Sequence, residues 1–180
     1  ATERGFELPS LPGDASCPVR WLCYSALLRE ANPPARAAGR WRHSLFIDGE
    51  GRLSSSGEGE VWMPILGHGE DVLRLNTPTR LPSTLGGERA VSVTAGAAHS
   101  LALTAGGSVW SWGHGHSGVW GHGDEQGQLE PRKVEAFAGE CIVGVSAGDF
   151  HSLALTAGGS VWSWGYGSYG QLGHGDEQSQ

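Results

Sequence analysis

The sequence predicts an all-β protein built from tandem repeats of 52 residues. A run of 15 residues, His99–Gly113, recurs letter for letter as His151–Gly165. The match extends into the flanks, since Val91–Gln128 and Val143–Gln180 differ at 10 of 38 positions. Glycine supplies 30 of the 180 residues, more than twice its usual share of about 7%. So much glycine with an ordinary apolar content indicates short strands joined by tight turns.

Each repeat is predicted to contain three or four short strands. Residues 91–94 and 100–104 alternate apolar and polar side chains, as half-buried strands do. Residues 105–107 supply a hairpin turn, and residues 108–112 are rich in strand-forming types. Residues 131–134 form a further short strand that begins with proline. This content is the size of one β-propeller blade.

A third, less regular copy precedes these two. The segment His43–Gly51 parallels His99–Gly107, and Leu66–Gly69 parallels Leu172–Gly175. The aromatic strand of this copy is reduced to Leu53–Ser56. We therefore expect the first repeat to be the least regular of the three.

The first 35 residues lie outside the repeat pattern. Four of their side chains recur at helical spacing: Trp21, Tyr24, Leu28 and Ala31. Asn32 is followed by two prolines, which would end such a helix. The predicted organisation is a non-repeat segment with a short helix over residues 1–35 and repeats over approximately 36–90, 91–142 and 143–180.

Composition restricts the classes of partner. The formal charge of −7 disfavours direct binding to nucleic acid. No apolar run is long enough to span a membrane. Three cysteines without paired spacing, Cys17, Cys23 and Cys141, favour a reducing compartment, so we expect an intracellular protein, cytoplasmic or nuclear. The chain starts without methionine, and we expect a fragment of a longer protein.

The repeat resembles that of the RCC1 (regulator of chromosome condensation) family. The resemblance rests on V-x-V-x-A-G-x-x-H-S-L-A-L-T at residues 143–156, G-x-V-W-S-W-G at 159–165 and G-Q-L-G-H-G-D at 170–176. In that family such repeats are blades of a seven-bladed β-propeller. The resemblance therefore implies a partial RCC1-type propeller of about three blades, with the remaining blades in a missing part of the chain.

Two glycine-rich segments fit the dinucleotide fingerprint G-x-G-x-x-G. They are Gly113–Gly118 and Gly165–Gly170, and each follows a predicted strand. A nucleotide site also needs a helix directly afterwards, whose N-terminus binds the pyrophosphate. Glycine-rich loop follows instead, so both segments are interpreted as structural and no cofactor is expected.

The histidines are interpreted as structural as well. His114, His116 and His122 fall within nine residues, but no cysteine or carboxylate completes a four-ligand set, so no metal is expected. His99 and His151 precede serines, yet adjacent residues on a strand point to opposite faces and do not form a nucleophile–base pair. We expect a buried imidazole that bonds backbone across blades, and no catalytic residues.

The tryptophans are predicted to pack between neighbouring blades. They lie two apart on strands, so each pair shares one face: Trp110 with Trp112, and Trp162 with Trp164. Trp41–His43 also resembles the G-W-R-H-T motif of plant UV-B photoreceptors, which are RCC1-type propellers. Here Arg40 stands in place of the glycine and Ser44 in place of the threonine.

The resemblance implies a protein-interaction scaffold without chemistry of its own, whose protein partner is not identified by the sequence. The alternative is guanine-nucleotide exchange on a Ran-type or other small GTPase. Propeller portions of large ubiquitin ligases and of UV-B photoreceptors are further family roles. Positions that depart from the 52-residue period are the candidate interaction residues: His114, His116, Val119 and Trp120 in the middle repeat, and Trp41 and Arg42 in the first.

Overall fold

A computed structural model describes residues 36–61, 63–83, 85–114, 118–119, 121–123 and 127–179. The helix predicted within residues 1–35 lies outside this part of the chain. The described residues form three antiparallel sheets, in which each strand pairs with its neighbours in chain order. The predicted all-β fold of about three propeller blades is confirmed.

The sheets contain four, four and three strands. Blade 1 consists of β1 (Ala37–Arg40), β2 (His43–Ile47), β3 (Leu53–Glu58) and β4 (Arg74–Arg80). Blade 2 consists of β5 (Ala90–Ala95), β6 (His99–Thr104), β7 (Val109–Gly113) and β8 (Gln128–Lys133). Blade 3 consists of β9 (Ile142–Ala147), β10 (His151–Thr156) and β11 (Val161–Gly165). Short 3-10 turns, Leu85–Gly87 and Glu135–Phe137, lie in the links between blades.

The identical segments of blades 2 and 3 form identical hairpins. Gly107 and its equivalent Gly159 have φ of 80° and 87°, which is the left-handed region that glycine adopts without strain. The amide of Ser108 donates to the Thr104 hydroxyl at 3.1 Å and closes the turn from within. The run Thr-Ala-Gly-Gly-Ser is therefore a self-contained turn, which accounts for its exact repetition.

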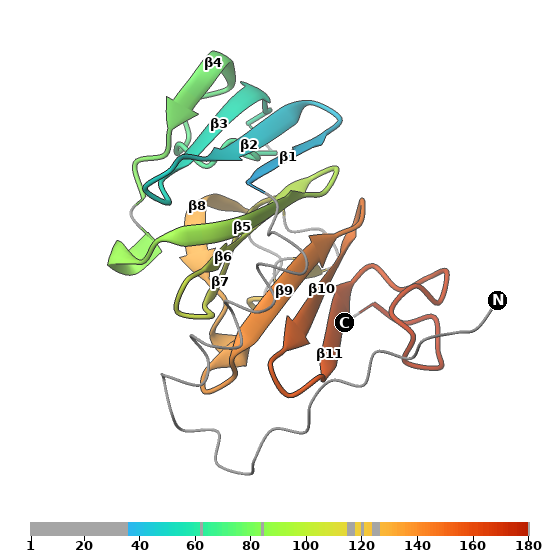
Figure 1. Cartoon of the computed structure of the whole chain (residues 1–180). Coiled ribbons are helices and arrows are strands. Elements are labelled where there is room, and N and C mark those ends of the chain that lie inside the picture. Colours follow the sequence, from blue (N-terminus) through green and yellow to red (C-terminus); the bar gives the residue numbers. More distant parts are fainter. Residues whose placement is uncertain are drawn as a thin grey trace, which may run out of the picture.

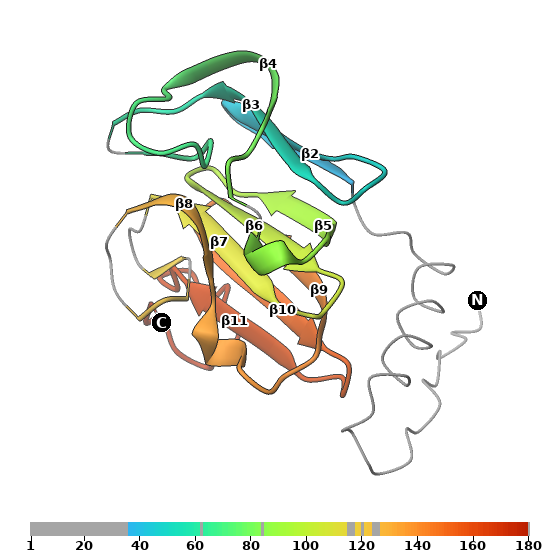
Figure 2. The same ribbon diagram turned by 90° about the vertical axis from the view of Figure 1, so that its left-hand side faces the viewer.

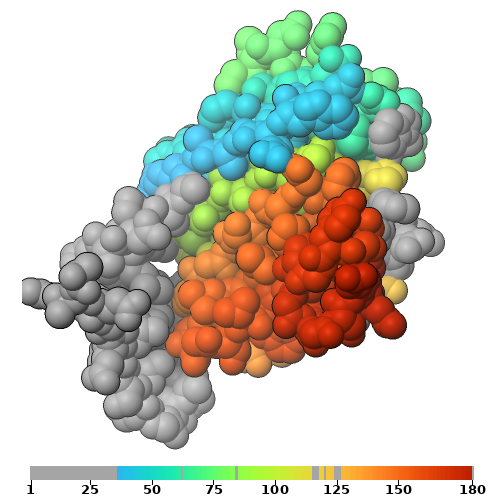
Figure 3. All heavy atoms as spheres, turned by 90° about the vertical axis from the view of Figure 1, so that its right-hand side faces the viewer, coloured from blue at the N-terminus to red at the C-terminus, as the bar shows by residue number. Residues whose placement is uncertain are grey.

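Blade 2 lies between blades 1 and 3 in both ribbon views (Figures 1 and 2), and the space-filling view shows the three in sequence order (Figure 3). Each sheet therefore has a preceding face, which packs on the earlier blade, and a following face, which packs on the next. Leu45, Ile47 and Leu53 cluster with Ala102 and Trp112 at the first interface. Leu101, Leu103 and Val109 cluster with Ala154 and Trp164 at the second. The predicted inter-blade packing of Trp112 and Trp164 is observed.

A histidine and a serine join each pair of blades. His43 Nε2 lies 2.9 Å from Ser100 Oγ, and His99 Nε2 lies 2.9 Å from Ser152 Oγ. The prediction that His99 bonds backbone across blades is therefore wrong in its acceptor, because the partner is a hydroxyl group. His99 is fully buried as expected, whereas His151 is only half-buried.

The same serines continue the connection to the backbone of the earlier blade. Ser152 Oγ donates to the Val119 carbonyl at 2.7 Å, and Trp164 Nε1 donates to the same oxygen at 2.9 Å. Ser100 and Trp112 bond the Ile65 carbonyl in the same way, at 3.3 and 3.0 Å. Since each hydroxyl has one proton and gives it to the carbonyl, the histidine Nε2–H must be the donor to the serine oxygen. We call this His–Ser–carbonyl chain, with its tryptophan, the latch.

The glycine three residues before the histidine makes room for the imidazole. A Cβ added at Gly96 would lie 2.4 Å from His99 Cε1 and 2.7 Å from the Gly148 carbonyl oxygen. A Cβ at Gly148 would lie 2.1 Å from His151 Cε1. The spacing A-G-x-x-H-S in blades 2 and 3 thus follows from one contact, in which the imidazole ring packs against the Cα of a glycine three residues earlier.

Gly96→Ala is expected to destabilise the protein by about 1–3 kcal/mol, because the added methyl group overpacks the imidazole seat. Gly49→Ala is the matched control, since a Cβ there meets nothing within 4 Å. Chemical denaturation of both variants measures the difference. Equal stability of the two variants would contradict the role given to Gly96.

Burial holds the latch histidines neutral. It lowers the pKa of His99 to about 3, and the neighbouring charges of His43 and His151 act in the same direction. Burial also lowers the pKa of His43 to about 4, and the nearby Arg40 backbone opposes this shift in part. The ordinary value is 6.5, so between pH 6.5 and these lower values the unfolded chain binds protons that the folded chain does not. Stability is fully present above pH 6.5 and falls as the solution is acidified.

Lowering the pH from about 7.5 to about 5.5 is expected to cost roughly 1–2 kcal/mol for each latch histidine. Urea denaturation at the two pH values measures this loss. In His99→Gln the contribution of that ring disappears, so the pH dependence becomes shallower although the variant is less stable at pH 7.5. An unchanged slope in His99→Gln would assign the acid sensitivity to other groups.

Candidate interaction face

The hairpin turns between the first two strands of every blade lie at the same end of the sheets. Residues 41–42, 97–98 and 149–150 form these turns. The loop that leaves the third strand of each blade is bonded to the same turn. Glu58 N donates to the Arg42 carbonyl at 2.9 Å, His114 N to Ala98 at 2.8 Å, and Tyr166 N to Phe150 at 2.7 Å. We call this end of the molecule, turns and loop starts together, the turn face.

Trp41 is the most unusual residue of the turn face. Its φ is 50°, in the left-handed region that side chains other than glycine rarely adopt, and it is 68% exposed. The Arg42 guanidinium lies 4.9 Å from the centre of its ring, and Arg42 also pairs with Glu60. Trp41 is therefore a bulky side chain on left-handed backbone that stays open to solvent.

Arg40 connects blades that are not neighbours in sequence order. Its Nε donates to Asp149 Oδ1 at 2.7 Å, across 109 residues of sequence, from blade 1 to blade 3. The turn of blade 2 does not separate them, because it carries only the methyl groups of Ala97 and Ala98. Ala97 N itself donates to the Asp149 carbonyl at 3.1 Å. The three turns are therefore tied together.

Blade 3 adds exposed aromatic side chains to this end. Phe150 is 46% exposed in the turn, and Tyr169 is 84% exposed in the loop after β11. Tyr169 packs edge-on against Tyr166, with ring centres 5.8 Å apart. Exposed aromatics beside arginine are the composition found at the centres of protein interfaces.

The structure places the predicted interaction residues in different settings. Trp41 and Arg42 lie on the turn face, and His114 begins a loop there. The Val119 side chain is 1% exposed and its carbonyl is the latch acceptor, so this residue contributes packing, while a partner contact by its loop stays a prediction. His116 and Trp120 lie outside the described residues.

Sequence reasoning missed four residues of the turn face: Arg40, Asp149, Phe150 and Tyr169. Departure from the repeat would have found all four, since Tyr169 too stands where the middle repeat has another residue, Ser117. Arg40 stands where blades 2 and 3 have glycine, and Asp149–Phe150 replace two alanines. The pairing of Arg40 with Asp149 had no signal in the sequence, because it depends on how closely the turns of blades 1 and 3 approach each other.

The first glycine of each G-x-G-x-x-G segment has a structural role. A Cβ added at Gly113 would lie 2.6 Å from the Ala98 carbonyl oxygen, and Gly113 has a φ of 115°. Gly165 is in the same position beside Phe150, with a φ of 104°. In the fully described third copy, bends and turns follow Gly170 instead of a helix.

The histidine of the G-H-G loop, which follows leucine in the first and third repeats and tryptophan in the middle one, has its own repeated partner. His68, His122 and His174 each place Nε2 against a serine of the third strand, at 3.0, 2.9 and 2.8 Å. In the described part of the chain, no three histidine, cysteine or acidic side chains gather as a metal site would require. The helices described there are too short or too polar to cross a membrane.

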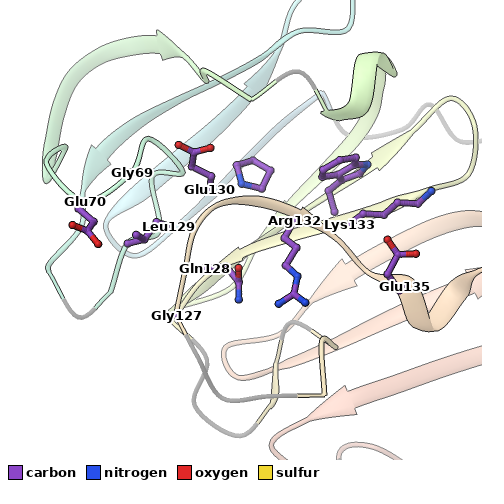
Figure 4. Close-up of a pocket in the computed structure, with 11 residues that line it drawn as sticks. Gly69, Glu70, Gly127, Gln128, Leu129, Glu130, Arg132, Lys133 and Glu135 are labelled. Carbon is purple, nitrogen blue, oxygen red and sulfur yellow. The ribbon is translucent and has the colours of Figure 1, made fainter.

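A groove of about 860 Å³ lies along β8, the outer strand of blade 2, beside a loop of blade 1 (Figure 4). Glu70 faces it from the loop, while Glu130, Arg132 and Lys133 line it from β8. The strand has one acidic and two basic residues beside the groove, and Glu70 and Glu135 add acidic groups, so the groove has no single charge. Its lining contains no feature that selects a class of ligand.

Comparison with known proteins identifies the repeat. The family model described as regulator of chromosome condensation (RCC1) repeat matches residues 106–155, and a second model of the same description matches residues 90–119 and 142–171. Human E3 ubiquitin-protein ligase HERC2 is 41% identical over 139 residues, which are 74% of this chain and 3% of HERC2. Ultraviolet-B receptor UVR8 of Arabidopsis thaliana is 42% identical over 111 residues, 62% of this chain and 25% of the receptor.

The fold comparison agrees. Prp20p of Saccharomyces cerevisiae, solved in a study of its binding to Gsp1p and histones, matches with a TM-score of 0.65 at 28% identity. The match covers 78% of this chain and 34% of Prp20p. The chain thus spans a small part of each of these relatives. Repeat sequence, blade structure and fold match agree, and the chain belongs to the RCC1 repeat family.

Proposed function

We propose that this protein is an interaction scaffold that binds a protein partner through its turn face and performs no chemistry of its own. The observation that carries the proposal is Trp41, a large aromatic side chain that is 68% exposed on left-handed backbone. Side chains of this kind contribute most of the binding energy at many protein interfaces. The relatives differ in activity while sharing the repeat, so the family alone does not choose a function.

The charges of the turn face support a protein partner. Arg40 pairs with Asp149, Arg42 with Glu60, and Arg74 with Glu58. A balanced surface lacks the excess of positive charge that phosphate backbones require. Ion pairs around an exposed aromatic centre instead resemble the polar rim of a protein interface.

Trp41→Asn is expected to abolish partner binding without loss of stability, because asparagine tolerates the left-handed region better than tryptophan does. Immobilised wild-type and variant chains, exposed to the same cell extract, are compared by quantitative mass spectrometry. The proteins that bind through the turn face should decrease about ten-fold or more with the variant. The free energy of unfolding should stay within about 0.5 kcal/mol of the wild type or rise.

Arg80→Ser is the control for that comparison. Arg80 is also exposed, but it lies at the other end of blade 1, where it pairs with Ser54 near the β2–β3 turn. It should retain every partner that Trp41→Asn loses. Equal retention of all captured proteins by the two variants would rule out the turn face as the contact site.

Guanine-nucleotide exchange is the second candidate. Its support is the 28% identity with Prp20p, a protein described with binding to the GTPase Gsp1p. Release of fluorescent GDP from Gsp1p or a related GTPase, measured with and without this chain, tests it. Under the scaffold proposal we expect no acceleration; a rate that rises with the concentration of this chain would replace the passive scaffold by an exchange factor.

A further inference from the structure

We propose that Thr77 is a phosphorylation site for a protein kinase that requires proline directly after the acceptor residue and prefers a basic residue three positions after it. The acceptor, the proline and the basic residue are Thr77, Pro78 and Arg80. In the whole sequence, Thr77 is the only serine or threonine that proline follows. The site lies on the outer strand of blade 1 and is independent of the partner proposed for the turn face.

A bulge in β4 exposes Thr77. β4 is the last strand of its sheet, so only one of its edges is paired, and both ribbon views show it at the outer side of blade 1 (Figures 1 and 2). Its register with β3 shifts between Ser55 and Gly57, so that residues 76–78 lie opposite Ser56 alone. All three bulged residues are exposed. Thr77 therefore lies outside the regular strand pairing.

The neighbouring threonine of the same strand is placed differently. Thr79 pairs with Ser55 in the register and is half-buried, and its hydroxyl donates to the Thr77 carbonyl at 3.1 Å. The Thr77 hydroxyl has no hydrogen bond to any residue that the structure describes. Of the two hydroxyl groups, that of Thr77 is therefore the one available to an enzyme.

Pro78 suits the segment to a kinase that selects proline. Its ring disfavours helical backbone at Thr77, so the acceptor residue stays extended. Proline also has no backbone N–H, so a kinase pocket that offers no hydrogen-bond acceptor can hold it without leaving a donor unsatisfied. Any other residue at this position would bring an unpaired N–H into such a pocket.

Arg80 supplies a charge that the kinase can recognise. Its side chain is exposed and makes no ion pair with any described residue. By contrast, Arg74 at the other end of β4 pairs with Glu58 at 3.0 Å. A guanidinium that has no carboxylate of its own can bind one on the kinase through two parallel hydrogen bonds.

Blade 2 shows that the bulge accepts a negative charge. β8 has the same shift of register, between Ser111 and Gly113 of β7. The pairs on either side of the two bulges align Thr77 with Glu130, and proline follows both residues. Glu130 is exposed, as Thr77 is. A phosphate on Thr77 gives blade 1 an acidic group where blade 2 has one by sequence, so we expect the fold to tolerate it.

The transfer takes its phosphoryl group from Mg²⁺-bound ATP and needs only the hydroxyl group from this chain. Thr77 Oγ1 forms a bond to the γ-phosphorus while the bond between that phosphorus and the β,γ-bridging oxygen breaks. The hydroxyl proton passes to the catalytic aspartate of the kinase, and ADP leaves.

The test incubates the folded chain with a proline-directed kinase of the cyclin-dependent class and Mg²⁺-bound ATP. Peptide mass spectrometry maps the phosphate, and its rate of incorporation is compared with that of a synthetic peptide of residues 71–83. We expect one phosphate per chain, at Thr77. The rate should lie within about ten-fold of that of the peptide, because the bulge does not have to unfold.

Four variants separate the contributions to recognition, and circular dichroism checks that each is folded. Thr77→Val should abolish incorporation, whereas the matched control Thr79→Val should leave its rate unchanged. Pro78→Ala should slow incorporation by about ten-fold or more, as expected for one unsatisfied N–H. Arg80→Gln should slow it by about five-fold, as expected for one exposed ion pair.

Three results would overturn the proposal. A chain that carries no phosphate at Thr77, although the peptide is phosphorylated, would show that the fold hides the acceptor. A peptide that is not phosphorylated would show that the kinase does not recognise the motif. Unchanged incorporation in Thr77→Val would assign the phosphate to another residue. Urea denaturation of the phosphorylated chain should match that of the unmodified one, and a clear loss of stability would contradict the equivalence with Glu130.

Discussion

The blades of this protein are held together by an imidazole that must remain neutral and buried. The His99 ring donates to Ser152 and rests on the bare Cα of Gly96, while the serine hydroxyl passes on to a backbone carbonyl. This contact combines three features: no side chain at Gly96, one donor on the ring, and one hydroxyl group on the next blade. The latch of blade 1 has the same ring and hydroxyl groups, with Arg40 in the place of the glycine. The His–Ser sequence, which resembles a nucleophile and its base, thus serves to hydrogen-bond one blade to the next.

This connection also determines where the protein is free to vary. The two turn residues directly before the histidine take no part in the latch, and they differ in all three blades: Trp41–Arg42, Ala97–Ala98 and Asp149–Phe150. The histidine–serine contact, which is the same at both blade interfaces, places these variable positions side by side at one end of the molecule. In arrays of repeats, each repeat ordinarily contacts only its neighbours. Here Arg40 of blade 1 reaches Asp149 of blade 3, because the turns of the turn face lie close together. The turn face is thus built from all three blades, although each latch joins only neighbouring blades.

The repeat made most of the fold predictable, since hairpin turns and strand alternation are local properties. The strand predicted over residues 131–134 is β8, Gln128–Lys133, and Pro131 is tolerated there because β8 is an outer strand. The sequence also separated Trp41 and Arg42 from the repeated residues. It did not reveal that the acceptor of His99 is a hydroxyl group, nor the pairing of Arg40 with Asp149. Both depend on the angle between sheets, which no local pattern encodes.

The three blades are not interchangeable, and their differences give the array a direction. Blade 1 keeps the following-face residues of the repeat, with His43, Leu45 and Ile47 buried against blade 2. On its preceding face, however, it has Phe46 and Ser56 where blades 2 and 3 have alanine and tryptophan. Blade 3 retains both sets. Since the energy of a repeat array is the sum of its interfaces, the face of blade 1 that lacks the indole donor and the face of blade 3 that keeps Leu155 and Val161 of the repeat are chemically distinct.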